Sequence, residues 1–231
     1  MAPLAQMAMM GTYAPSSVTS VEQTDIRSKQ GGGNSPNTFA SVAFGSLGPR
    51  VWSVALLQQY DVTNEPSISG VTIGGVPALR QVDHTGDGAG KATGICIARA
   101  QPAVSSGDVV ITWATSTARP AMSLVMLRVV GFNLTTLSDA AQLPDIEQNG
   151  AGKTLNIDTV AEGLLIGGAC KRNTNNITWT NLTEQGEDTQ SVHRRSWGWD
   201  HPTALQSNRA VSFTSTGSAL VSMLLQSFPK Y

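Results

Sequence analysis

The segment Ser191–His201 (SVHRRSWGWDH) contains the densest group of residues that could bind a ligand. Successive side chains of an extended strand point to opposite faces, so every second residue here shares one face. These residues are His193, Arg195, Trp197, Trp199 and His201. Aromatic rings beside hydrogen-bonding groups suit a sugar ring, and aromatic rings beside basic groups suit single-stranded nucleic acid. We favour packing in the core or between subunits for this face, and we take Arg195, Trp197 and Trp199 as the candidate residues if it binds a glycan instead.

Two glycine-rich segments imitate a phosphate-binding loop without meeting its requirements. Such a loop needs a first glycine, a later Gly-Lys followed by Ser or Thr, and then a helix. In Asn149–Thr154 the first position is Glu147, and the residues that follow predict a strand. In Gly86–Lys91 the lysine is followed by Ala92, which has no hydroxyl for Mg²⁺. Asp83–Gly88 offers oxygen ligands but lacks the final acidic ligand of a calcium loop, so we read it as a polar turn.

The remaining reactive side chains are scattered. The three histidines suggest no catalytic triad, and the sequence has no Gly-x-Ser-x-Gly elbow. Asp145 and Glu147 form a near carboxylate pair, but nothing else supports a glycosidase. Cys96 and Cys170 each lie in an apolar strand candidate, which predicts two buried free thiols. The sequence therefore predicts no catalytic residues, no metal site, no cofactor and no enzyme activity.

Composition narrows the classes of partner. Only 13% of the 231 residues are charged, and the net charge is −1. A chain with so little net charge has no strong positive electrostatic field to attract nucleic acid or an anionic membrane surface. No apolar run reaches the ~20 residues of a membrane span, and the first residues lack the basic and continuous apolar regions of a signal peptide. We expect neither a nucleic-acid nor a membrane partner.

Short β-rich runs recur about every ten residues, which predicts an all-β fold of the jelly-roll or immunoglobulin-like antiparallel sandwich type. Ala121–Val130 is apolar on both alternating faces and predicts a strand buried from both sides. We expect Ala114–Pro120 to join it to Val109–Trp113 as a hairpin, and Leu137–Asn149 to be a loop or short helix. The other predicted strands are Thr38–Phe44, Arg50–Gln58, Ser69–Ile73, Pro77–Val82, Gly94–Ala100, Thr154–Thr159, Gly163–Lys171, Ile177–Leu182, His193–Trp199, Ala210–Thr214 and Ala219–Phe228.

Residues 1–36 predict an N-terminal arm that ends in glycine and proline breakers. Ser17–Val21 suggests a short edge strand within it. The arm carries apolar side chains that could dock on a neighbouring chain. They are Leu4, Met7, Met9, Met10 and Tyr13.

Residues 37–231 predict a β-sandwich whose halves, 37–131 and 150–228, form an internal pseudo-twofold repeat. Val51–Leu57 corresponds to Gly163–Ala169, and Gln101-Pro102 corresponds to His201-Pro202. We also match Val109 with Ala210, and Arg128 with Gln226, near the ends of two further strand pairs. We favour one shared sandwich, because each half offers only about six short strands.

Four segments resemble, in their arrangement, a group of structural proteins from tailed bacteriophages and prophages. The segments are SGVTIGGVPAL (Ser69–Leu79), ARAQPAV (Ala98–Val104), SGDVVIT (Ser106–Thr112) and AMSLVMLRVVG (Ala121–Gly131). The resemblance covers roughly residues 37–131 and, more loosely, 150–228. It implies a virion component, such as a capsid decoration or head-fibre protein, or one attached to the neck or tail. It implies no catalytic residues.

We therefore expect a non-enzymatic virion structural protein on the particle exterior, made in the cytoplasm of the bacterial host. Its expected partners are other virion proteins and further copies of itself, bound through the arm. The alternative is a carbohydrate-binding module that attaches to a host-surface glycan through Arg195, Trp197 and Trp199.

Overall fold

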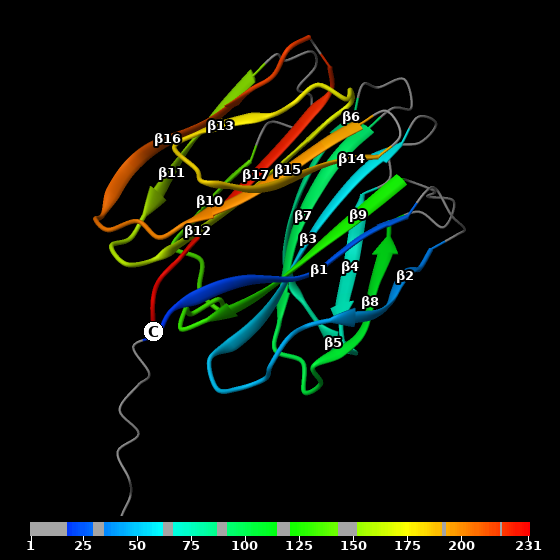
Figure 1. Cartoon of the computed structure of the whole chain (residues 1–231), viewed down its shortest axis with the longest axis vertical. Helices are drawn as coiled ribbons and strands as arrows, with labels where there is room; N and C mark the ends of the chain where they lie inside the picture. The colour runs from blue at the N-terminus through cyan, green and yellow to red at the C-terminus, as the bar shows by residue number, and fades with distance from the viewer. Residues whose placement is uncertain are drawn as a thin grey trace, which may run out of the picture.

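The computed structural model describes residues 18–29, 35–61, 67–86, 92–114, 121–142, 152–190, 193–217 and 219–231. These residues form antiparallel strands and no helix, which confirms the predicted all-β sandwich class. The strands make four sheets stacked from the upper left to the lower right of Figure 1. The sandwich expected over residues 37–231 is thus built from four sheets rather than two, and it includes a strand from within residues 1–36.

The first half of the chain forms two facing sheets. One has the order β1-β9-β3-β7-β6 and the other β2-β8-β4-β5. Alternate apolar residues of β8, such as Val109, Ile111 and Trp113, are buried between the two sheets. The strands are β1 (Ser20–Lys29), β2 (Asn37–Ala43), β3 (Val51–Asp61), β4 (Ile68–Ile73), β5 (Val76–Pro77), β6 (Leu79–Gly86), β7 (Ala92–Ala100), β8 (Ser106–Trp113) and β9 (Ala121–Val130).

The second half repeats this arrangement. Its sheets have the orders β10-β17-β12-β15-β14 and β11-β16-β13, with their own apolar core around Leu165, Phe213 and Met223. The strands are β10 (Asp139–Gln142), β11 (Gly152–Thr159), β12 (Leu164–Lys171), β13 (Thr178–Thr180), β14 (Glu184–Gln190), β15 (His193–Asp200), β16 (Gln206–Thr214) and β17 (Val221–Phe228).

Strand pairing corrects the sequence match by one residue in two places. Val109 lies opposite Phe39 and Val211 lies opposite Leu155, so Val109 corresponds to Val211 rather than to Ala210. In the same way Leu124 lies opposite Leu57 and Met223 opposite Ala169, which moves the partner of Arg128 from Gln226 to Ser227. A shift of one residue exchanges the two faces of a strand, and only the pairing shows which face is buried.

The two inner sheets pack face to face, and we call this contact the central interface. Its apolar core includes Leu56, Ile97, Leu127, Ile166 and Trp197. β9 is covered on both sides, as predicted: Leu124 faces the first core and Leu127 faces the central interface. The expected hairpin is wrong, because β8 and β9 belong to different sheets and residues 114–120 connect those sheets.

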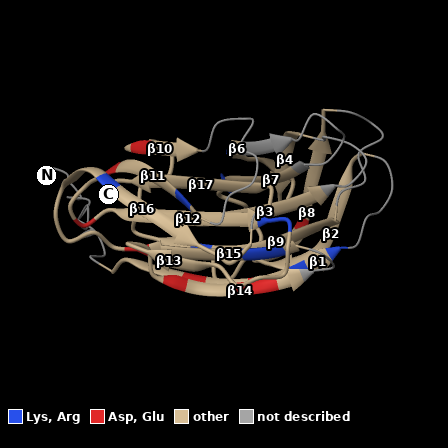
Figure 2. Ribbon diagram, turned by 90° about the horizontal axis from the view of Figure 1, so that it is seen from above, with Lys and Arg blue, Asp and Glu red and all other residues tan. Residues whose placement is uncertain are grey.

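Three polar strands lie where the sequence predicted little structure. β1 runs along β9 at one edge of its sheet and extends well beyond the expected Ser17–Val21. β10, from the segment expected to be a loop or helix, pairs with β17. β14 pairs with β15 and carries acidic residues along the outer edge (Figure 2). β1 and β10 occupy equivalent positions in the two strand orders, so the repeat includes these edge strands.

Candidate functional site

Trp197 lies inside the central interface rather than on a surface. Its side chain is 3% exposed and packs in the core between the inner sheets. Its indole nitrogen Nε1 donates to Oε1 of Gln23 on β1 at 3.1 Å. Trp197 therefore joins the two halves. It has no exposed ring face on which a sugar could stack.

The other two candidate glycan residues are also covered. The side chain of Arg195 is 0% exposed and forms an ion pair with Asp188 of β14. Burial lowers the pKa of Arg195, while the charge of Asp188 acts in the opposite direction. Trp199 is half-buried against the same core as Trp197. Arg195 and Trp197 therefore do not form a surface site, and packing, the favoured interpretation, describes Trp197 and Trp199.

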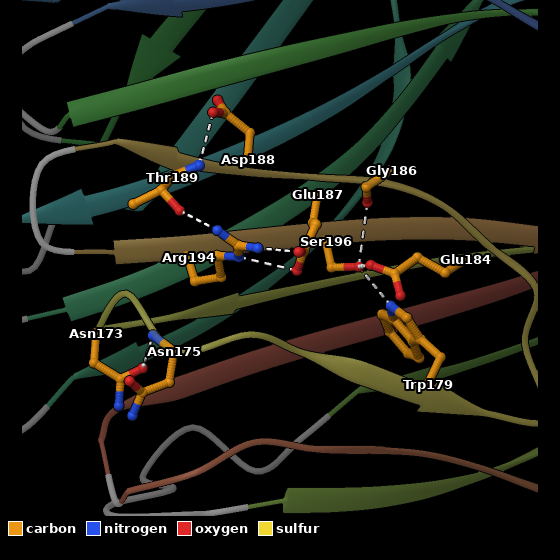
Figure 3. Close-up of polar contacts among 10 residues, drawn as sticks. All are labelled: Asn173, Asn175, Trp179, Glu184, Gly186, Glu187, Asp188, Thr189, Arg194 and Ser196. Carbon is orange, nitrogen blue, oxygen red and sulfur yellow. Dashed lines mark hydrogen bonds and ion pairs between the residues drawn. The ribbon is translucent and has the colours of Figure 1, made fainter.

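Side-chain contacts fasten β14 to β15, as Figure 3 shows. The hydroxyl of Ser196 donates to Oε1 of Glu184 at 2.8 Å and accepts from Nε1 of Trp179 at 2.7 Å. Arg194 forms an ion pair with Glu187. Burial raises the pKa of Glu184. The carboxylates of β14 thus hold a structural edge, and they leave no open pair for acid–base chemistry.

Buried polar groups line one end of the central interface. Nε2 of Gln58 donates to the carbonyl oxygens of Ala169 and Ser196, each at 3.1 Å, and so links the two halves. His193 is buried with its ring 5.4 Å from that of Tyr60. Burial, with a smaller effect from the charge of Arg195, lowers the pKa of His193 to about 3. His193 is therefore neutral at physiological pH.

The apolar arm residues Leu4, Met7, Met9, Met10 and Tyr13 lie outside the described residues. The surface at which the described chain begins is nevertheless well defined, and we call it the terminal face. It consists of Val18, Arg50 and Tyr231, together with Leu47 in the loop that leads to Arg50.

Contacts hold the terminal face together. The backbone nitrogen of Tyr231 donates to the carbonyl of Gly131 at 3.2 Å, and Arg50 lies over the Tyr231 ring at 4.9 Å. A side chain at Gly131 would come within 2.7 Å of the Val18 carbonyl, so both ends of the described chain meet here (Figure 1). Val18 is 63% exposed, and Leu47 and Tyr231 are each 46% exposed. The chain thus presents apolar side chains at the point where residues 1–17 join it.

Two hollows lie on the second half. One, of about 560 Å³, is lined only by neutral polar residues: Thr174, Asn175, Asn176, Thr178, Thr214, Ser215 and Thr216. The other, which we call the Asp200 pocket, has a volume of about 350 Å³. It is lined by Asn181, Asp200, His201, Pro202, Thr203, Gln206 and Arg209. Sequence reasoning missed both, because each needs segments that meet only in the fold: 174–178 with 214–216 in the first, and Asn181 with 200–209 in the second.

Both cysteines are buried free thiols, as predicted, and burial raises the pKa of Cys96 to about 12. Within the described ranges, no three His, Cys, Asp or Glu side chains are grouped so that they could hold a metal ion. The described chain also has no helix long and apolar enough to cross a membrane. The side chains of the predicted polar turn Asp83–Gly88 lie outside the described residues.

Comparison with known proteins identifies no relative: no family model, no curated protein and no solved structure matches this chain.

Proposed function

We propose that this protein is a non-enzymatic structural component on the exterior of a tailed-bacteriophage virion, and that it assembles through its N-terminal residues. The terminal face supports the assembly part of the proposal. Val18, Leu47 and Tyr231 expose apolar side chains, and apolar side chains gathered on a surface mark interaction sites. In the sequence, Leu4, Met7 and Met9 belong to the segment that precedes Val18.

The virion part of the proposal rests on the resemblance of four segments to phage structural proteins. The structure shows which elements two of these segments form. SGVTIGGVPAL contains the turn between β4 and β5, where Gly74 and Gly75 have positive φ angles of 58° and 81°. AMSLVMLRVVG is β9 with Gly131 beyond its end, and β9 is buried on both faces. These segments thus form strands and turns of the first half, and the doubled sandwich to which that half belongs suits a component of an assembled particle.

The assembly part is tested by measuring mass in solution by light scattering for the full chain and for a variant lacking residues 2–17. The deletion stops before β1, so we expect it to leave the four sheets intact. We expect an oligomer for the full chain and a monomer for the deletion. The same mass for both proteins would contradict assembly through the arm.

A point substitution separates the terminal face from the arm. Leu47→Ser should shift the same equilibrium toward monomer. Leu79→Ser is the matched control, because Leu79 is 48% exposed but lies on β6, at the edge of its sheet opposite β1. An equal effect of the two substitutions would show that the terminal face has no special part in assembly.

The virion part is tested on particles purified from bacteria that produce this protein. Mass spectrometry should find the protein in the purified particles, and the deletion of residues 2–17 should remove it from them. Absence of the intact protein from the particles would overturn the virion assignment whatever the result of light scattering.

A further inference from the structure

The Asp200 pocket is built from side chains that hold one another in place. Nη2 of Arg209 donates to Oδ2 of Asp200 at 2.5 Å and to the carbonyl of Asn181 at 2.6 Å. Oδ1 of Asp200 accepts from the backbone nitrogen of Thr183 at 3.3 Å. The side-chain amide of Asn181 donates to Ala210 O at 2.8 Å. The wall of the pocket is therefore fixed before any ligand arrives.

One side of the pocket is an aromatic plate with a rigid support. The ring of His201 stacks on Phe132 with centroids 5.3 Å apart and planes 14° from parallel. Phe132 is fully buried, so its ring supports the His201 ring from the protein side. Pro202, the next residue, is buried and lines the pocket beside His201. A flat, partly apolar ligand face would find a matching surface here.

The pocket also offers hydrogen-bonding groups that the protein leaves to solvent. Among the described residues, the amide of Gln206, the hydroxyl of Thr203 and the imidazole of His201 form no hydrogen bond within the chain. Amides and hydroxyls both donate and accept, as sugar hydroxyls do. Asp200 and Arg209 neutralise each other, which gives the pocket no strong preference for an ion.

The first half of the molecule shows that the fold does not need this pocket. By strand pairing, Ala100 takes the place of Asp200, since they lie opposite the equivalent residues Ser53 and Leu165. Gly107 takes the place of Arg209, because each lies two residues before the matched valines of β8 and β16. The first half thus forms the same sheets with Ala100 and Gly107 in place of the ion pair between Asp200 and Arg209. The fold itself therefore does not require that ion pair.

We propose that the Asp200 pocket binds a single neutral sugar ring, such as a terminal monosaccharide of a surface glycan. The ring's hydroxyls would pair with Gln206, Thr203 and Asn181, and its C–H face would lie on His201. A volume of about 350 Å³ is at the lower end of small-molecule pockets, which favours one ring over a longer chain. This proposal does not depend on the assignment to a virion.

The test is a titration followed by ¹H–¹⁵N nuclear magnetic resonance on the full chain. The probes are D-glucose, D-galactose, D-mannose, N-acetyl-D-glucosamine and L-rhamnose, each into the millimolar range, with D-glucuronic acid as an anionic probe. We expect at least one neutral sugar to shift the side-chain amides of Gln206 and Asn181 and the Nε–H of Arg209, in a saturable way. No saturable shift of these signals, or one with glucuronic acid alone, would overturn the proposal.

Substitutions tie any shift to the pocket. His201→Ala and Gln206→Ala remove exposed side chains, so both variants should fold normally. Each should weaken the apparent affinity, by up to about tenfold where a hydrogen bond to the sugar is lost. Gln101→Ala is the matched control, because Gln101 occupies the position of His201 in the first half, and it should bind as the unaltered protein does. Unchanged binding in both pocket variants would place the sugar elsewhere and overturn the proposal.

Discussion

At the scale of single residues, Trp197 shows what a sequence pattern can and cannot establish. Alternation along the strand placed Trp197 and Trp199 on one face, and the structure confirms that both contact the central interface. Alternation does not show which part of the protein packs against that face. Here the inner sheet of the first half packs against it, and Gln23 on β1 accepts a hydrogen bond from Trp197. The same limit hid the Asp200 pocket, where Asn181, just after β13, meets residues 200–209 only in the folded chain.

His193 gives a prediction at this scale. Burial and the charge of Arg195 lower its pKa from 6.5 to about 3 in the folded chain. Between pH 6.5 and pH 3 the unfolded chain binds a proton at this histidine that the folded chain does not. The free energy of unfolding therefore falls as the pH drops through this range. The slope from this residue approaches about 1.4 kcal/mol per pH unit. His193→Phe cannot be protonated and should reduce the pH dependence of the free energy of unfolding.

Urea unfolding at pH 7 and pH 4.5 measures that dependence. Leu79→Ser serves as the control, because it changes an exposed side chain that does not titrate and should leave the pH dependence unchanged. If His193→Phe loses as much stability between the two pH values as the unaltered protein does, His193 is not the group responsible.

At the scale of strands, apolar sequences were predicted well and polar ones were not. The limits of β9 were predicted to the residue, because its apolar residues fill the cores on both sides. β1, β10 and β14 are polar strands whose sheet neighbours supply the apolar cover, so their own residues need not alternate clearly. β14 has the sequence EQGEDTQ, which contains no apolar residue. The basic residues Arg194 and Arg195 of the neighbouring strand β15 pair with its carboxylates.

β1 is fastened by hydrogen bonds as well as by its ladder with β9. The carboxylate of Asp25 accepts from the backbone nitrogen of Ala43 at 3.0 Å and from Nε of Arg27 at 2.7 Å, and these bonds lower its pKa. Asp25→Ala removes the link from β1 to the end of β2 and should cost about 1–2 kcal/mol of unfolding free energy. Urea unfolding at neutral pH measures this cost.

Glu22→Ala is the matched control for Asp25→Ala. Glu22 lies on the same strand but makes only a 3.9 Å ion pair with Arg128, and its side chain is 65% exposed. Exposed pairs of this kind contribute little, so the substitution should leave the unfolding midpoint almost unchanged. Equal costs for the two substitutions would show that the bond from Asp25 to Ala43 does not fasten β1.

At the scale of the whole molecule, the sequence correctly paired several strands of the two halves but could not show how the halves combine. Each half has its own core, and the inner sheets then bury a third core between them. Arg99 adds to this junction: its Nε donates to Leu134 O at 2.5 Å, and its guanidinium lies over the ring of Phe228. Neither half could leave the other without exposing these apolar residues and a buried charge.

The two halves should therefore unfold together. Leu56 is fully buried in the central interface, and Leu56→Ala should cost about 2–5 kcal/mol, the usual range for such a cavity. Since β16 lies in the outer sheet of the second half and has no direct contact with Leu56, faster hydrogen exchange there would report coupling between the halves. We expect the substitution to speed exchange of the most protected amides in both β8 and β16, measured by mass spectrometry. Faster exchange in β8 with unchanged exchange in β16 would mean that the halves are independent units, and that the central interface joins them without making them one cooperative structure.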